Sequence, residues 1–297
     1  MFKKEHIDLL KLYAVSPLHA GSGSSTGAVD LPIQRERHTN WPHIQASGVK
    51  GALRAHFREM VDEKYPPDSI NKTEQLIFGT EDYQIEENGV KKKESCPGAI
   101  AVSDAKLIAF PMRSNIAPFV WVTSPAVLTR IDLDLVMMGR EGIKDLSMFN
   151  IDNDQAICLA GDITGNVLLE DAVVRVVNSA PIDFFKMNFS ELDRLVLISD
   201  TMYDYCVSTC TEVQTQIKID ETTGTAEPGA LRYEELLPAD AVLYSVIAFS
   251  KAGLANELQV DAVQKTFKNT IKDFLQIGGD ATLGRGICKI DWMGGIQ

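Results

Sequence analysis

The sequence lacks the long hydrophobic runs and the paired cysteines that define several large classes of protein. No stretch of its 297 residues approaches the roughly 18 to 20 apolar residues that a membrane-spanning helix needs. The N-terminal residues 1–6 lack the apolar core of a secretory signal. The five cysteines have no metal-ligand spacing, and their odd number favours reduced thiols. These absences predict a cytoplasmic protein without a membrane partner.

Positive charge is also scarce, but what there is gathers in one place. The chain has 29 Lys and Arg residues against 41 Asp and Glu residues, for a net charge of −12. Such a balance argues against nucleic acid unless the basic residues cluster. Residues 31–60 hold only two acidic residues beside five basic ones, which are Arg35, Arg37, Lys50, Arg54 and Arg58. This window can bind a phosphate backbone, although a solvated helix face has the same composition.

The order of strand and helix patterns predicts an α+β fold. Strands are expected at residues 7–15, 98–112, 119–123, 167–177, 241–249 and 287–290, and helices at 48–63, 125–138 and 260–275. Ser47 and Ser124 are the expected helix N-caps. We interpret residues 1–297 as a single domain with a ferredoxin-like (RRM-like) antiparallel sheet, present once or twice. Polar or irregular insertions at 64–97 and 139–165 decorate it.

Residues 212–238 predict a long β-hairpin. Polar and apolar residues alternate with period two over 213–219, a turn follows at 221–225, and a second strand leads out over 231–237. The segment has too little apolar surface to form a core of its own.

Residues 18–30 form a glycine- and serine-rich loop that ends in a single carboxylate, Asp30, and a Pro-containing segment with charged residues follows over 31–36. Its glycines leave the backbone permissive, so the loop can lie against a bulky polyanion and present one acid to it. The alternative is an ordinary turn aspartate. His19 and His38 are candidate general bases, although a structural role is the more common one for a single histidine.

A second glycine-rich segment lies near the C-terminus. Backbone amides around Gly278, Gly284 and Gly286 can approach a phosphate closely, and Arg285 adds positive charge. The segment lacks the Gly-Lys-Ser/Thr of a P-loop, and a helix is expected before it and a strand after it, the reverse of a dinucleotide-binding motif. A tight helix-to-strand turn is the alternative.

Several of these segments resemble one family. Residues 19–23, 29–36 and 44–54 are similar to the N-terminal signature of RAMP proteins, and more narrowly to the repeated backbone subunit of the Cmr (type III-B) CRISPR effector complex. Residues 109–114, 121–125, 233–238 and the closing glycine loop fit the same subunit. The resemblance spans nearly the whole chain, and its specific parts are residues 30–36 and 47–54.

The resemblance implies an RRM-like protein whose copies stack along a CRISPR guide RNA, together with other Cmr-complex subunits, in a helical filament. A β-hairpin thumb of each copy, here residues 212–238, would interrupt the duplex of guide and complementary target RNA. The target would be cut beside each thumb by attack of a ribose 2′-hydroxyl on the adjacent phosphate, with a divalent metal ion such as Mg²⁺ or Mn²⁺.

The same resemblance assigns roles to residues. Asp30 matches the catalytic aspartate and would help to hold the metal. Lys50 and Arg54 match positions that face the guide RNA, and Arg113, Gly284, Arg285 and Gly286 are expected to join them. His19, Arg35 and Lys218 are secondary candidates. Two alternatives stay open: a purely architectural guide-binding subunit, and a guide-precursor processing ribonuclease with a histidine as general base.

Overall fold

The computed structural model describes residues 3–60, 67–87, 90–144, 146–253 and 258–293, and within them the chain forms a mixed α+β fold. The helices are α1 (Ala46–Met60), α2 (Pro67–Phe78), α3 (Pro125–Met137), α4 (Asp183–Asn188), α5 (Asp200–Thr209) and α6 (Val260–Thr270). The first eight strands are β1 (Ile7–Ala14), β2 (His43–Ile44), β3 (Thr80–Glu87), β4 (Val90–Cys96), β5 (Ile100–Val102), β6 (Ala105–Arg113), β7 (Phe119–Thr123) and β8 (Gln155–Ala160). The remaining strands are β9 (Gly165–Leu169), β10 (Ala172–Ser179), β11 (Leu195–Ile198), β12 (Glu212–Gln216), β13 (Arg232–Leu236), β14 (Val242–Phe249), β15 (Asp273–Gln276) and β16 (Ile287–Met293).

One large, mostly antiparallel sheet organises these elements. Its strand order is β15-β16-β1-β14-β6-β7-β11-β8-β10-β9, with β2 beside β6 and β5 beside β14. The pairs β7–β11 and β8–β10 are parallel, whereas the other pairs of this sheet are antiparallel. The predicted α+β class with an antiparallel sheet is therefore confirmed.

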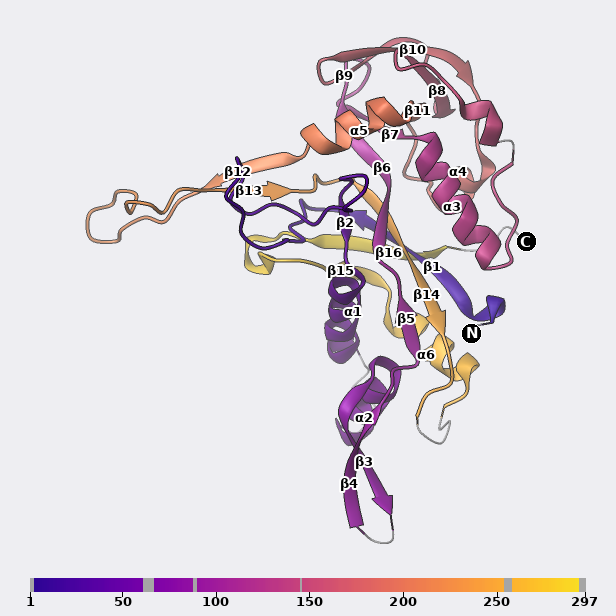
Figure 1. Ribbon diagram of the computed structural model, residues 1–297, viewed down its shortest axis with the longest axis vertical. Helices are drawn as coiled ribbons and strands as arrows, with labels where there is room; N and C mark the ends of the chain where they lie inside the picture. The colour runs from indigo at the N-terminus through magenta and orange to yellow at the C-terminus, as the bar shows by residue number, and fades with distance from the viewer. Residues whose placement is uncertain (1–2, 61–66, 88–89, 145, 254–257, 294–297) are drawn as a thin grey trace.

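The core sits where helices cover this sheet. Every residue of β14 is buried, and so is β1 apart from the half-buried Tyr13. Helices α1 and α6 pack together over the part formed by β15, β16, β1 and β14, below the sheet in Figure 1. Phe267 of α6 lies at the centre of an aromatic cluster with Phe57, Phe78, Phe249 and Trp292.

Helices α3, α4 and α5 belong to the other half of the sheet, with strands β7 to β11, at the upper right of Figure 1. Two hairpins project away from the body: β12–β13 to the left and β3–β4 at the bottom of the view. Each is a separate two-stranded sheet. The hairpin expected at 212–238 is thus present, with its paired strands at the base and exposed residues 217–231 at its tip.

Three strand and helix predictions are wrong in their extent. The segment 167–177 is not one strand, because Glu170 adopts a left-handed backbone conformation and turns β9 back into β10. The helix expected at 260–275 stops at Thr270, and a left-handed Asp273 begins β15. The region 139–165 is not wholly irregular, because its apolar run 156–159 forms the buried strand β8 inside the sheet.

The helix N-caps show why one local prediction failed. Ser124 caps α3 as expected, and its hydroxyl accepts a hydrogen bond from the Val127 amide. Ser47, however, lies inside α1, which begins one residue earlier. The carboxylate of Asp104 accepts a hydrogen bond of 2.7 Å from the Ala46 amide. A residue 58 positions away therefore accepts the hydrogen bond of an unpaired amide at the start of the helix. A local sequence pattern does not predict such a contact.

No helix among the described residues combines the length and the apolar character that crossing a bilayer requires.

The aromatic cluster predicts that alanine substitution lowers the free energy of unfolding far more at Phe267 of α6 than at Phe274 of β15. Phe267→Ala removes a fully buried ring and should lower the free energy of unfolding by about 3–5 kcal/mol. Phe274→Ala removes a ring that is 54% exposed and should change it by less than about 0.5 kcal/mol. Chemical denaturation measures both values, and equal losses would contradict this account of the core.

Candidate active site

Strand β13, the second strand of the projecting hairpin, runs between two loops that come from opposite ends of the chain. Leu31 of the N-terminal glycine-rich loop forms a parallel bridge with Glu234, and Leu18 forms an antiparallel bridge with Leu237. On the other side of the strand lies the C-terminal glycine loop, residues 277–286, which Glu234 reaches through its side chain. The candidate site is built around this strand.

Asp30 is held directly by β13. Its Oδ2 accepts a hydrogen bond of 2.7 Å from the Tyr233 amide, and its own amide donates to the Tyr233 carbonyl at 3.1 Å. The carboxylate is half-buried, and Oδ1 receives no hydrogen bond from the described residues. Asp30 therefore has a fixed position and one carboxylate oxygen available for chemistry.

Glu235 fastens the residues that follow Asp30. It is buried, and its Oε2 accepts a hydrogen bond of 3.0 Å from the Ile33 amide. Its Oε1 accepts from the Arg35 guanidinium at 2.5 Å and from the Thr211 hydroxyl at 2.8 Å. The guanidinium of Arg35 also donates to the Val207 carbonyl in α5, so Arg35 is a structural link in this structure.

Glu234 faces the other side of β13, since neighbouring strand residues point to opposite faces. It pairs with Arg285, which also bonds Asp280 at 3.0 Å and Gln214 at 2.7 Å. Arg285 is only 7% exposed, and its guanidinium is turned inward. This differs from the predicted phosphate contact: the charge of Arg285 balances a buried glutamate, because leaving that glutamate unpaired would cost several kcal/mol.

The C-terminal glycines allow the two loops to pack closely. The Gly279 amide donates to the His19 carbonyl at 2.8 Å, and the Gly286 amide donates to the Pro17 carbonyl at 2.9 Å. A Cβ atom at position 278 would lie 2.4 Å from the His19 oxygen. A tight turn therefore accounts for Gly278 and Gly286, whereas Gly284 has open space around it. The expected helix-to-strand connection is wrong, because β15 lies between α6 and the glycine loop, which joins β15 to β16.

His19 lies between β13 and the C-terminal glycine loop. Its Nδ1 is 2.8 Å from the Glu235 carbonyl oxygen, and its Nε2 is 3.8 Å from Glu234 Oε1. The side chain is only 12% exposed. Asp30, His19, Arg35 and Arg285 are thus brought together around one strand, and Oδ1 of Asp30 has no hydrogen-bond partner among the described residues.

The start of α1, the helix that carries Lys50, Arg54 and Arg58, is bound to the N-terminal loop. Gln34 bonds the backbone of both His43 and Gln45, immediately before α1. Lys50 is half-buried, and burial together with the nearby Arg54 charge lowers its pKa below the ordinary lysine value. Arg54 pairs with the buried Glu74 of α2, which Arg58 also bonds at 3.0 Å.

The other predicted RNA contacts lie further away. Arg113, at the end of β6, is 76% exposed and pairs with Glu170 at 3.1 Å between β9 and β10. Lys218, in the exposed part of the β12–β13 hairpin, pairs with Glu227 at 2.7 Å. Neither residue lies beside Asp30, so their roles stay predictions.

The far end of the N-terminal loop is anchored in the α3–α5 half of the molecule. Arg130 of α3 bonds both oxygens of Glu36 at 2.9 Å and lies over the Trp41 ring. The Trp41 indole donates to Asp204 of α5 at 2.9 Å. The hydrogen bonds from Thr39 and Arg130 outweigh burial and lower the pKa of Glu36, which keeps it charged.

The described residues contain no group of three His, Cys, Asp or Glu side chains that could hold a metal ion. Asp30 by itself offers one free oxygen. Mg²⁺ is nevertheless often bound by one or two carboxylates together with substrate phosphates and water. Asp30 thus fits a metal shared with RNA, and it does not fit a metal site made by the protein alone.

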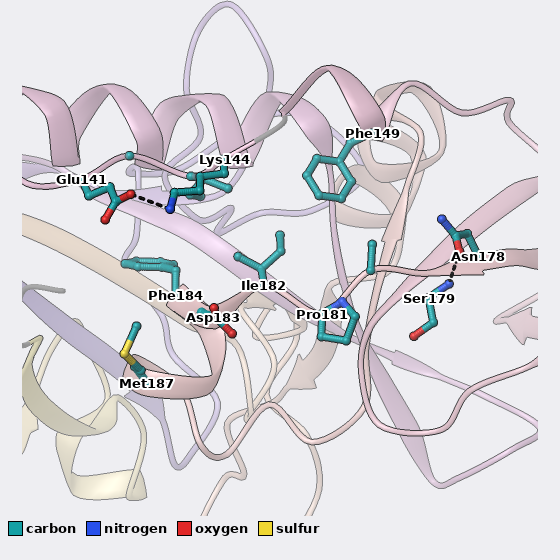
Figure 2. A pocket seen from close by; sticks show the side chains of 13 residues that line it. Glu141, Lys144, Phe149, Asn178, Ser179, Pro181, Ile182, Asp183, Phe184 and Met187 are labelled. Carbon is teal, nitrogen blue, oxygen red and sulfur yellow. Dashed lines mark hydrogen bonds and ion pairs between the residues drawn. The ribbon is translucent and has the colours of Figure 1, made fainter.

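A pocket of about 450 Å³ lies in the other half of the molecule, between the end of α3 and α4 (Figure 2). Apolar side chains such as Phe149, Ile182 and Phe184 line it. Glu141 and Lys144 also line it and form an ion pair with an N–O distance of 2.8 Å. None of the predicted site residues lines this pocket.

Sequence reasoning missed Glu234 and Glu235. Both are almost fully buried, at 3% and 6% exposure, and they carry most of the side-chain contacts of the site. The only local signal was two adjacent acids in a strand followed by the apolar Leu236 and Leu237. That pattern does not say which loops the acids would hold.

The sequence matches the family profile of the RAMP superfamily over residues 11–289. This match covers most of the chain, which therefore belongs to the RAMP superfamily and confirms the resemblance seen in its motifs.

Comparisons with individual proteins narrow the family. The chain is 33% identical over 300 residues to the CRISPR system Cmr endoribonuclease Cmr4 of Pyrococcus furiosus, covering 95% of this chain and 94% of the relative. That identity shows membership of the Cmr4 family. A crystal structure of oligomeric Cmr4 from Pyrococcus furiosus is similar with a TM-score of 0.65 and 27% identity, covering 97% and 98% of the two chains. A type III-B Cmr-beta structure bound to cognate target RNA shares the fold, with a TM-score of 0.71, 20% identity and 97% coverage of both chains.

The two glycines of the C-terminal loop predict different costs for the same substitution. Gly284 and Gly286 both have φ of +72°, so alanine at either position costs about 1–2 kcal/mol of unfolding free energy. A Cβ at Gly286 would also lie 1.9 Å from the Ile277 carbonyl oxygen, which should add about 1–3 kcal/mol or more. Denaturation of Gly284→Ala and Gly286→Ala measures the difference, and equal stabilities would contradict the packing described here.

Proposed function

We propose that this chain is the repeated backbone subunit of a type III-B CRISPR effector complex, and that it cleaves target RNA paired to the guide. The observation that carries the proposal is Asp30: one of its carboxylate oxygens is fixed by Tyr233, and the other is free at the base of a projecting hairpin. The names of the Cmr4 relatives support the same activity and an oligomeric, RNA-bound setting.

A ferredoxin-like unit forms the proposed core. The elements β1, α1, β6, β14, α6 and β16 follow the order βαββαβ along the chain, and their strands are ordered β16-β1-β14-β6 in the sheet. This sequence of elements and the antiparallel pairing support the assignment. It places the helix with Lys50 and Arg54 directly after the loop that carries Asp30.

The β12–β13 hairpin acts as the thumb in this proposal. Exposed apolar side chains follow it, including Val213, Ile217, Ile219 and Leu231, all at least 47% exposed. A hairpin with such a surface and no core of its own is suited to insert between bases or to pack on a neighbouring copy. Asp30 lies at its base, so a target strand displaced by the hairpin would pass the carboxylate.

The proposed reaction is attack of a target ribose 2′-hydroxyl on the adjacent phosphorus. The P–O5′ bond breaks, and the products end in a 2′,3′-cyclic phosphate and a 5′-hydroxyl. In-line alignment of a flipped-out nucleotide supplies part of the rate, and the free Asp30 oxygen accepts or orients the 2′-hydroxyl proton. A divalent ion shared by Asp30 and RNA phosphates would stabilise the developing charge.

Lys50, Arg54, Arg113 and the amide of Gly284 are the proposed contacts to the guide backbone.

Replacing Asp30 tests the activity. In the complex assembled with guide and target RNA, Asp30→Ala should lower the cleavage rate by about 10²–10⁴-fold, because it removes the proton acceptor and metal ligand. Binding of guide and target should change less than twofold. Asp183→Ala, which removes an aspartate with an 84% exposed side chain in α4, is the matched control and should cleave normally. Unchanged cleavage by Asp30→Ala would leave only an architectural role.

Removing divalent ions tests the shared metal. A chelator such as EDTA should abolish cleavage by the complex and leave the thermal midpoint of the chain unchanged within about 1 °C. The reason is that the described residues form no metal site of their own. Cleavage that persists in EDTA, above all by the isolated chain, would instead favour a metal-independent processing ribonuclease.

A further inference from the structure

The geometry points to Glu235 as the positioning residue that holds Asp30 in the position needed for cleavage of the target RNA. This inference rests on the function proposed above. Glu235 never touches the free Asp30 oxygen. It acts through the backbone and side chains of residues 31–35, which it fastens to the base of the β12–β13 hairpin.

Backbone pairing alone does not fix the place of Asp30. The contact between Leu31 and Glu234 is an isolated parallel bridge and not part of a ladder. A single bridge specifies the register only weakly, and the other bridge to this strand, between Leu18 and Leu237, lies twelve residues before Asp30 in the loop. A slip along β13 would move the Asp30 carboxylate away from the Tyr233 amide. A side-chain contact to the residues just after Asp30 would therefore strengthen the register.

The Glu235 side chain supplies that contact. Its carboxylate accepts from the Ile33 amide at 3.0 Å and from the Arg35 guanidinium at 2.5 Å, in addition to the bridge itself, in which the Glu235 amide donates to the Leu31 carbonyl at 3.0 Å. The backbone of Glu235 thus binds position 31, and its carboxylate binds positions 33 and 35. The two bonds to the carboxylate engage a charged, buried acceptor, so they are stronger than bonds between neutral groups.

The same carboxylate also joins both strands of the hairpin. The Thr211 hydroxyl, immediately before β12, donates to Glu235 Oε1 at 2.8 Å. The bases of both strands and the segment after Asp30 therefore share one acceptor group. This arrangement makes the hairpin and Asp30 move as one unit, so the carboxylate stays beside the nucleotide that the hairpin displaces.

The substitution Glu235→Gln keeps the size of the side chain and changes its hydrogen bonding. One carboxylate oxygen becomes an NH₂ group that faces N–H or O–H donors in either orientation of the amide. We expect the single-turnover cleavage rate at saturating target to fall about 10–100-fold, since a misplacement of about 1 Å has such an effect. The dissociation constants for guide and target should stay within twofold, because the residue touches neither RNA.

Asp8→Asn is the matched control. Asp8 is equally buried, at 6% exposure, and holds Arg140, Lys268 and Gln264 at 2.8–2.9 Å near the opposite end of β1. It should lower the thermal midpoint as Glu235→Gln does and leave the cleavage rate unchanged within twofold below that midpoint.

Thr211→Val provides a milder second variant, which keeps the inference testable if Glu235→Gln does not assemble. It should lower the rate about three- to tenfold at unchanged binding. Added to Glu235→Gln, it should cause no further loss, because both remove the same linkage.

The outcomes distinguish a failure of the positioning role of Glu235 from a failure of the proposed function. If Asp30→Ala is inactive while Glu235→Gln and Thr211→Val cleave at the wild-type rate, the positioning role is wrong and the proposed function stands. If Glu235→Gln loses binding and cleavage equally, or Asp8→Asn loses cleavage as much, Glu235 is merely structural. If Asp30→Ala cleaves normally, the proposed function itself fails.

Discussion

The attachment of the N-terminal glycine-rich loop to strand β13 is the constraint on which the candidate site depends. Two adjacent buried glutamates make this attachment possible. Glu235 holds the segment after Asp30, and Glu234 holds Arg285 of the C-terminal loop on the opposite face of the strand. Loops from the two ends of the chain are thus brought to one strand, and that strand belongs to the hairpin that leaves the body.

Each of the two buried carboxylates needs a positively charged partner, because an unpaired buried charge is strongly destabilising. Glu235 is paired with Arg35 and Glu234 with Arg285, so both arginines neutralise buried glutamates inside the protein. The predicted RNA contacts Lys50 and Arg113 take no part in these two buried pairs, and their roles stay predictions. Asp30 is the acid of the site that keeps an unbonded oxygen among the described residues. The division between structural and reactive groups follows from which charges are already paired.

Much of the fold could be predicted from local patterns, because they report burial. The strands at β1, β7 and β14, the helix α3 with its Ser124 cap, and the hairpin at 212–238 all follow from periodicity and turn residues. The predictions failed where a distant residue decides the outcome. Asp104 sets the start of α1, and left-handed Glu170 and Asp273 divide segments that look continuous. The site shows the same limit: Asp30 was found from its loop and the family resemblance, whereas the roles of Glu234, Glu235 and Arg285 depend on contacts between residues about 50 to 200 positions apart.

Hydrogen exchange of the chain measures the central attachment directly. The amides of Asp30, Leu31 and Ile33 all donate to residues 233–235. If the loop and β13 form one unit, these three amides should show the same protection as the amides of β13, and they should open together with it. Fast exchange at the amides of Asp30, Leu31 and Ile33 beside a protected β13 would show that the loop is not held, and it would contradict the account.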